Sequence, residues 1–343
     1  MSYIPRNATP ERFASEVGNF GFNAVLRQLN KQRPGHTFTR ETLEAIVAAN
    51  PLAYADGKMT YTKRFNGDKK KDVTTLQESP VKNTCRHIVV EALAAVYGEA
   101  QPKEPLRLVS LPGTEFKAEK LMLNHPKLQG KIGEVVGVEA FPDMIPAVET
   151  SARQLCLAYP GVKFTVFQGR DTDLTDAGRV ALDPDAGVNL IWLDEMTFFT
   201  LSTRTALEKL MSNSYMFERA WNEGKPALLF VTFRAQFEAK CNREFLKSEA
   251  AATTNILPGA SITDTKNVNH QFRLQGLAGF LSRLGAENGV DVKPLTQIIY
   301  KHNAGRGGSV MLLCGFELRK GPTQSYTLEA ERVMPIRDTA TAS

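Results

Sequence analysis

The sequence has few of the residues that build metal centres and disulfide frameworks. Its 343 residues include four cysteines and five histidines. The cysteines lie 71, 85 and 73 residues apart, which fits neither a CxxC motif nor a disulfide-dense fold. The histidines are scattered and form no HExxH motif. We therefore expect structural thiols and no metal ion.

Other absences narrow the class of protein. The sequence contains no GxxxxGK[ST] phosphate-binding loop and no GxSxG nucleophile elbow. It has no apolar run near the ~18 residues that span a bilayer, and its first residues lack the apolar core of a signal peptide. These absences disfavour an NTPase, an esterase and a membrane protein, and we expect a cytoplasmic protein. Its composition, 42% hydrophobic and 23% charged, is typical of globular chains.

Charge is nearly balanced overall but is concentrated in one segment. The chain has 42 basic and 37 acidic residues, whereas positions 58–86 alone hold eight basic and three acidic ones. Tyr61 and Phe65 lie among these cations, a pattern that can neutralise phosphates and stack on bases. The segment predicts DNA or RNA binding, with a solvated loop as the alternative. The predicted nucleic-acid contacts are Lys63, Arg64, Lys69, Lys70 and Lys71.

The first 80 residues predict a separate helical region. Thr9 is suited to cap a helix that has Pro10 at its first position, and apolar residues follow at helical spacing. A second helix is expected to begin at Thr39 and to end at Asn50. Residues 55–72 are compatible with a hairpin or wing.

From position 106 the pattern changes to short apolar runs separated by helix-sized connections. The first five runs are 106–111, 134–139, 162–167, 188–193 and 226–233. Their starts lie 28, 28, 26 and 38 residues apart, which leaves room for the crossover that parallel strands require. Helical patterns at 84–97, 146–159 and 203–221 precede or separate them. This alternation predicts an α/β fold with a doubly wound sheet.

The last two runs break the rhythm. They occupy 295–300 and 309–318, and their starts are 14 residues apart, too close for a crossover helix. They therefore predict an antiparallel hairpin. The expected fold is a doubly wound seven-strand sheet, mostly parallel, with this C-terminal antiparallel hairpin and a helical N-terminal region. We divide the chain into the region 1–80, a sheet domain 81–322 with a helical insertion at about 234–292, and a tail 323–343.

In this order of elements, residues 84–320 resemble the class I (Rossmann-like) S-adenosylmethionine-dependent methyltransferases. The resemblance implies the cofactor S-adenosylmethionine, bound at the carboxyl ends of the strands where strand order reverses. The family's glycine-rich turn would correspond to Leu111, Pro112 and Gly113. Only Gly113 matches it, and the GxGxG spacing is missing.

Two further loops match the family's cofactor site in part. Glu139 ends the second strand, where the family uses an acid to accept the two ribose hydroxyls. After the third strand come Gly169, Arg170 and Asp171, and the resemblance places an acid here against the adenine amine. Asp171 is the first candidate for that role, and Asp173 is the second.

The loop after the fourth strand would face the methyl acceptor. Asp194 or Glu195 is the candidate catalytic residue, because a carboxylate held within hydrogen-bond reach can act as a general base. The sequence lacks the Asp-Pro-Pro-Tyr type of motif, which disfavours the enzymes that methylate exocyclic amines of DNA bases. Phe198 and Phe199 line either the pocket or the core.

Two functions follow. The first is S-adenosylmethionine-dependent methyl transfer to an acceptor that includes nucleic acid among its candidates. The alternative is a methyltransferase-like fold without activity that serves as a nucleic-acid-binding or interaction module, since fold alone does not establish activity.

Overall fold

The computed structural model describes residues 9–11, 13–14, 17, 22–32, 38–51, 80–169, 173–174, 187–235, 240–252, 265–302, 309–326 and 333–336. The chain divides into two compact units, Met1–Glu78 and Ser79–Ser343, and each is described by itself.

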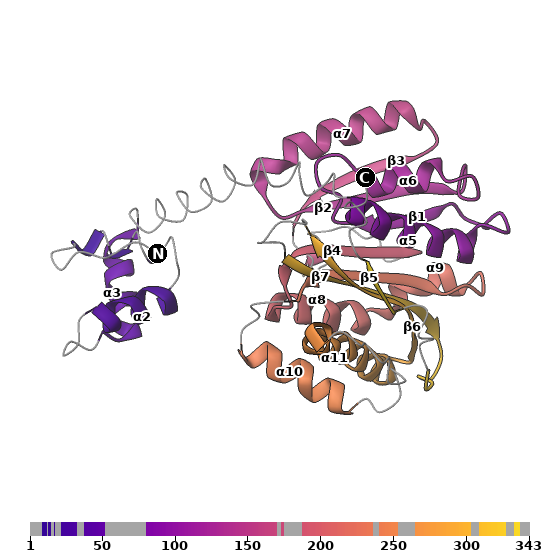
Figure 1. Ribbon diagram of the computed structural model, residues 1–343. Helices are drawn as coiled ribbons and strands as arrows, with labels where there is room; N and C mark the ends of the chain where they lie inside the picture. Colours follow the sequence, from indigo (N-terminus) through magenta and orange to yellow (C-terminus); the bar gives the residue numbers. More distant parts are fainter. Residues whose placement is uncertain are drawn as a thin grey trace, which may run out of the picture. The chain divides into compact units, whose positions relative to one another are not determined.

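The smaller unit contains the helices α2 (Phe22–Gln32) and α3 (Arg40–Ala49), together with helical residues from position 10 onward (Figure 1). Thr39 caps α3 by accepting a hydrogen bond from the backbone N–H of Thr42, as the sequence predicts. The side chain of Asn30 bonds both the N–H and the carbonyl of Phe38, which fixes the connection into α3. A small apolar core joins these segments: Phe13, Val17, Val25, Leu29 and Leu43.

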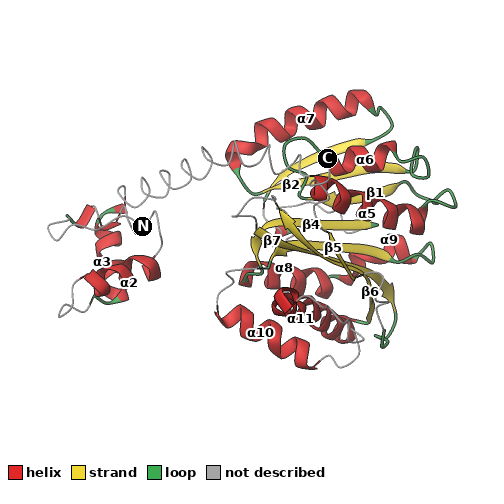
Figure 2. Cartoon of the chain, viewed as in Figure 1, coloured by secondary structure: helices red, strands yellow, loops and turns green. Residues whose placement is uncertain are grey.

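The larger unit is built on one sheet, and its described strands follow the order β3-β2-β1-β4-β5-β7-β6-β8 (Figure 2). The strands are β1 (Leu106–Ser110), β2 (Ile132–Glu139), β3 (Lys163–Gln168), β4 (Leu190–Phe198), β5 (Ala227–Arg234), β6 (Val290–His302), β7 (Ser309–Lys320) and β8 (Val333–Ile336). Strands β1 to β5 pair in parallel, and β7 runs antiparallel to both β5 and β6. The predicted seven-strand sheet with its reversed strand is confirmed, and it is the fold that the resemblance to class I methyltransferases implies.

Helices cover both faces of this sheet, which explains why its central strands are continuous apolar runs. Every residue of β1 is buried, whereas the edge strand β3 is half-exposed along its length. The helices are α5 (Pro80–Tyr97), α6 (Lys117–Asn124), α7 (Ile145–Ala158), α8 (Leu201–Ser212), α9 (Glu218–Trp221), α10 (Lys240–Ala252) and α11 (Thr265–Asn288). Helix α7 packs beside β3 and α11 beside β6, at opposite ends of the sheet (Figure 1).

One face of the sheet, which we call the α5 face, meets α5 and α6. Side chains alternate along a strand, and the register places Ser110 of β1 beside Gly137 of β2 and Trp192 of β4. The opposite face carries an aromatic cluster in which Phe199 contacts the rings of Phe233, Phe245 and Phe280. Phe199 is therefore a core residue, and the side chain of Phe198 lies outside the described residues.

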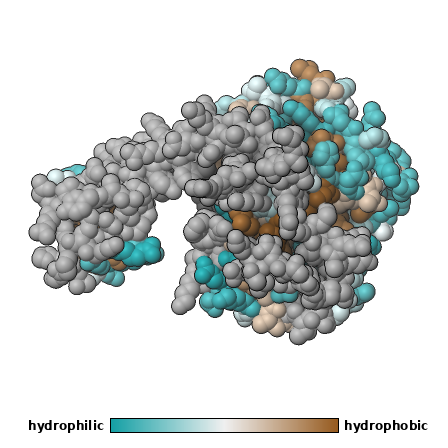
Figure 3. Space-filling model, viewed as in Figure 1, coloured by the Kyte–Doolittle hydropathy of each residue, from teal (hydrophilic) through white to brown (hydrophobic). Residues whose placement is uncertain are grey.

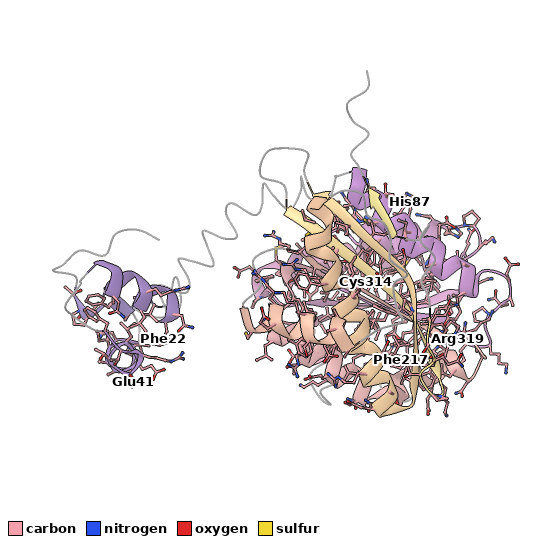
Figure 4. All side chains as sticks on the ribbon, turned by 60° about the horizontal axis from the view of Figure 1, so that its bottom comes forward. Phe22, Glu41, His87, Phe217, Cys314 and Arg319 are labelled. Carbon is pink, nitrogen blue, oxygen red and sulfur yellow. The ribbon has the colours of Figure 1, made fainter. Side chains whose placement is uncertain are left out.

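The interior of the larger unit is densely filled. Cys314 of β7 is fully buried there, among the side chains shown in Figure 4. The surface carries isolated apolar residues, among them Leu157 and Leu201, and Figure 3 shows both hydrophilic and hydrophobic areas among the described atoms. Such single exposed apolar residues are ordinary on a soluble surface.

The structure differs from the sequence prediction in three elements. The expected helix 203–221 is interrupted by a 3₁₀ turn at Ser214–Phe217, and β6 begins five residues earlier than expected. The tail also contributes β8, which pairs in parallel with β6 at the edge of the sheet. A strand of four residues is too short to show a periodic pattern in the sequence.

Candidate functional site

The strand order reverses between β1 and β4, because the chain proceeds outward from β1 to β2 and β3 and then returns to β4. Ligands of doubly wound sheets bind at the carboxyl ends of the strands at such a switch point. The backbone N–H of Leu111, just after β1, donates to the carbonyl of Trp192 at 3.2 Å. The two strands are thereby joined up to the level of Trp192.

The loop after β1 folds back on β2 instead of leaving the strand ends open. Gly113 and Phe116 both take left-handed backbone conformations, with φ of 61° and 50°. Phe116 is 0% exposed, and its ring packs edge-on to Phe164 of β3. A Cβ at Gly137 would lie 2.9 Å from Pro112 Cγ and 3.1 Å from Phe116 Cζ, so this glycine is needed to seat the loop. Protein atoms therefore occupy the space above β2.

Glu139 ends β2 on the same face as Gly137. Its Oε1 accepts a hydrogen bond from the backbone N–H of Phe141 at 2.8 Å, and its backbone carbonyl accepts one from Gly169 at 3.0 Å. The second and third predicted loops are thus brought together. The ring of Phe141 is 46% exposed beside Glu139, and the sequence analysis did not select it. The sequence feature that could have identified Phe141 is an aromatic residue two positions after the acid that ends the strand.

The other predicted residues of the third loop are less well placed. Asp173 is half-buried in a short turn, and Arg170 and Asp171 lie outside the described residues. The structure consequently brings Leu111, Pro112, Gly113, Glu139 and Gly169 to one edge of the sheet.

Asp194 is the predicted catalytic residue that the structure describes fully. Its Oδ2 lies 2.9 Å from Nζ of Lys82 on α5, and the two side chains are 17% and 10% exposed. Its Oδ1 is buried and has no hydrogen-bond partner in the described structure. Glu195 lies in β4, but its side chain is outside the described part of the chain.

A bulge in β4 follows Asp194. Asp194 is paired with Thr232 of β5, whereas Phe198 is paired with Arg234, so four steps along β4 correspond to two steps along β5. Bulges of this kind bend a strand and redirect its side chains next to binding sites. The strand end after Asp194 is therefore irregular where the methyl-acceptor loop was predicted.

Asp194 belongs to a buried polar group on the α5 face, which we call the switch-point cluster. Ser110 donates its Oγ–H to Oε1 of the fully buried Glu119 on α6 at 2.5 Å, and the other carboxylate oxygen of Glu119 has no partner among the described residues. Arg86 of α5 is 5% exposed and lies within electrostatic range of both carboxylates. The members of the cluster are Lys82, Arg86, Ser110, Glu119, Asp194 and Tyr300.

Burial dominates the ionisation of this cluster. It raises the pKa of Glu119, an effect opposed by the Ser110 hydrogen bond and by Arg86. Burial likewise raises the pKa of Cys85 to about 12, and the charge of Asp194 adds to that increase. The pKa of Tyr300 is raised well above its usual range, again mainly by burial. Cys85 and Tyr300 are thus neutral at physiological pH and are poor nucleophiles.

Lys82 and Arg86 belong to the basic segment 58–86 of the sequence, at its C-terminal end. Both side chains are buried on α5, on the stripe that also holds Val89 and Leu93, so they do not form a surface for nucleic acid. The signal was available, because cations spaced by four residues fall on one helix face with the apolar stripe. The predicted contacts Lys63, Arg64, Lys69, Lys70 and Lys71 lie outside the described residues.

The described residues contain no group of three or more His, Cys, Asp or Glu side chains arranged to hold a metal ion. Among the described helices, none combines the length and the hydropathy that crossing a bilayer requires.

Several solved structures resemble this chain at low sequence identity. No protein-family model and no curated protein sequence matches the chain. A Listeria monocytogenes protein proposed to be a class I S-adenosylmethionine-dependent methyltransferase is 11% identical, with 95% of this chain and 93% of that chain covered and a TM-score of 0.40. The plantazolicin methyltransferase BamL, solved with a substrate analogue and S-adenosylhomocysteine, is 11% identical over 73% of this chain and 90% of its own, with a TM-score of 0.40.

A proposed transferase from Pyrococcus horikoshii is 9% identical, with 67% of this chain covered and a TM-score of 0.33. The match spans 62% of that protein, less than two thirds of its length. Because the TM-scores of these three structures are below 0.5, the assignment of the fold rests on the strand order of this chain.

Proposed function

We propose that the chain catalyses S-adenosylmethionine-dependent methyl transfer at the carboxyl ends of β1, β2 and β4. The proposal rests mainly on the two carboxylate oxygens of Asp194 at the switch point. Oδ2 is paired with Lys82, and Oδ1 is buried without a hydrogen-bond partner in the described structure. An unpartnered carboxylate oxygen in a buried site costs about 1–3 kcal/mol or more. Such a cost is typical of sites that are completed by a ligand.

The residues at β2 fit the adenosyl part of the cofactor better than the loop after β1 fits its methionine part. Glu139 ends its strand beside Gly169 and the exposed ring of Phe141, so a hydroxyl acceptor and an apolar surface lie together. Pro112 and Phe116, by contrast, fill the space above Gly137. We therefore assign the ribose to Glu139 and leave the methionine part to the switch-point side.

The protein contributes position and electrostatics to the transfer. The bound cofactor supplies an electrophilic methyl group. Asp194 orients the acceptor and takes its proton through Oδ1, while Lys82 holds Oδ2 at 2.9 Å. Glu195 is the second candidate for this role. Burial of the pair excludes water, which strengthens both interactions.

The closing of the loop after β1 favours a second candidate function. A chain that fills the cofactor's space with Phe116 and Pro112 could retain the scaffold as a binding module without transfer activity.

In both cases a nucleic-acid partner is proposed from the lysines at 63–71. That part is tested by replacing Lys69, Lys70 and Lys71 with glutamine. Salt-dependent binding to DNA or RNA should weaken, and unchanged affinity would remove nucleic acid from the proposal.

Calorimetry separates the two functions. We expect saturable binding of S-adenosylmethionine and of S-adenosylhomocysteine by the full chain, weakened at least about tenfold by Glu139→Ala. The matched control is Glu149→Ala, since Glu149 is an exposed α7 residue paired only across one helical turn with Arg153 in the described structure. Binding that is absent in the wild-type protein would favour the module. Binding that is equal in both variants would remove Glu139 from the site.

A further inference from the structure

Arg234 is a half-buried cation at the strand ends that the proposed transfer does not use. It is the last residue of β5, and alternation along the strand places it on the α5 face with Thr232, the residue paired with Asp194. Its Nε is buried without a hydrogen-bond partner. Throughout the described residues, no ion pair or hydrogen bond to its guanidinium is found.

The sheet register connects Arg234 to the buried cations of α5. The register sets Met311 of β7 beside Arg234, and Tyr300 of β6 beside Met311. Tyr300 in turn lies within electrostatic range of Arg86 and Asp194. Helix α5 places Lys82 and Arg86 in its first two turns, so the positive end of the helix dipole faces the same strand ends.

The acidic members of the switch-point cluster do not neutralise Arg234. Asp194 is paired with Lys82, and Glu119 accepts the hydroxyl of Ser110. The ends of β4 and β5 therefore offer one carboxylate oxygen and one guanidinium, on neighbouring strands about 4.8 Å apart. A guanidinium presents paired N–H donors that match the oxygens of a phosphate or a carboxylate.

We propose that Arg234 binds an oxyanion, a phosphate or a carboxylate, carried by the methyl acceptor itself. The inference rests on the proposed function and names its substrate class: an anionic acceptor whose reacting atom lies against Asp194 while its charged group lies against Arg234. A neutral acceptor would leave the guanidinium without a counter-charge in a half-buried position, which is costly.

The experiment titrates the full chain with inorganic phosphate and, separately, with acetate at low ionic strength. Nuclear magnetic resonance or calorimetry follows the wild-type protein, Arg234→Gln, Arg234→Lys and the control Arg153→Gln. Arg153 is an exposed arginine of α7, so its substitution removes the same charge from the surface. We expect Arg234→Gln to weaken phosphate or acetate binding about tenfold or more, Arg234→Lys to retain part of the affinity, and Arg153→Gln to change nothing.

The anion with the higher affinity identifies the group that the acceptor carries. Equal affinity in the wild-type protein and in Arg234→Gln would overturn the inference. So would a parallel loss of S-adenosylmethionine affinity in Arg234→Gln, because the arginine would then serve the cofactor. If the wild-type protein binds phosphate through Arg234 but does not bind S-adenosylmethionine, the anion site stands and the proposed methyl transfer fails.

A second measurement requires no substitution and covers the case in which Arg234→Gln does not fold. Phenylglyoxal modifies accessible arginines, and the modified positions are mapped by mass spectrometry. Phosphate or acetate should slow the modification of Arg234 severalfold while that of Arg153 is unchanged. Equal protection of both arginines, or of neither, would contradict a site at Arg234.

Discussion

The carboxyl edge of the sheet has two halves that differ in what fills them. At β1 and β2 the space is closed by Pro112 and Phe116, whose side-chain carbons pack over Gly137. At β4 and β5 the buried groups are charged, and Asp194 and Arg234 each have an unpartnered polar atom within the described structure. The first half contributes packing energy, whereas the second costs stability. Evolution tolerates such a cost where a ligand restores the missing contacts.

The largest loss of stability is expected when a buried side chain is removed from the packed half. Replacing Phe116 with alanine removes a fully buried ring that touches Phe164, and we expect a loss of about 3–5 kcal/mol in the free energy of unfolding. Denaturant unfolding measures it. Phe141→Ala is the control, because that ring is half-exposed and its loss should cost far less.

The backbone conformation of Phe116 provides a second test of the packed half. Its φ of 50° is left-handed, a conformation that costs a residue with a Cβ about 1 kcal/mol and suits glycine. We therefore expect Phe116→Gly to be no less stable than Phe116→Ala, the reverse of the usual order. A glycine variant that is clearly the weaker of the two would show that the left-handed turn is not maintained.

In the charged half, the ion pair of Lys82 and Asp194 should contribute to the stability of the fold. Replacing Lys82 with methionine leaves a mostly buried carboxylate without this partner, and we expect a loss of about 3 kcal/mol. Adding Asp194→Asn should recover part of that loss, because the amide carries no charge. Denaturant unfolding of the single and double variants gives the coupling energy between the two residues.

Lys131 supplies the matched lysine for this cycle. It is also buried, but its Nζ donates to the carbonyls of Tyr97, Gly98 and Ala100. Asp194→Asn should therefore leave the cost of Lys131→Met unchanged. Equal coupling to both lysines would mean that Asp194 acts through the general charge of the unit and that its pair with Lys82 has no specific role.

The fold could be predicted from the sequence because its strands are long, buried runs at regular spacing. Strands β1 and β5 are buried along almost their whole length, so their apolar runs do not depend on fine periodicity. The reversed strand β7 followed from the short connection to β6, which excludes a crossover. Strand β8 was missed because its four residues carry no pattern of their own.

Candidate site residues could be proposed from the sequence only near the carboxyl ends of strands, which meet at one edge of the sheet. Glu139 ends β2 and Asp194 lies just before the bulge of β4, and their roles in binding and catalysis stay predictions. Lys82, Arg86 and Glu119 come from helices, and their burial depends on how α5 and α6 are seated on the sheet. A sequence motif does not specify that packing, and a basic segment is more simply interpreted as surface. The closing of the first loop likewise depends on the fit of Phe116 over Gly137.

The smallest expected effect is a dependence on pH at Glu119. Burial raises the pKa of this carboxyl above its ordinary value of 4.5, so the folded protein holds the proton more tightly than the unfolded chain does. The stabilisation that this proton gives is complete below pH 4.5 and is lost as pH rises through the pKa of the folded state. Glu119→Gln keeps an oxygen that can accept the Ser110 hydroxyl but cannot ionise. Relative to this variant, the wild-type protein should therefore lose stability with increasing pH.

Denaturant midpoints of the two proteins between pH 4 and pH 8 measure the difference, with Glu149→Gln as an exposed control. We expect the midpoint of Glu119→Gln to rise above that of the wild-type protein as pH increases, while Glu149→Gln follows the wild-type protein throughout. A constant difference would show that Glu119 keeps one charge state across the range. In that case Arg86 would be balancing an ionised carboxylate, and the charged half of the edge would extend as far as α6.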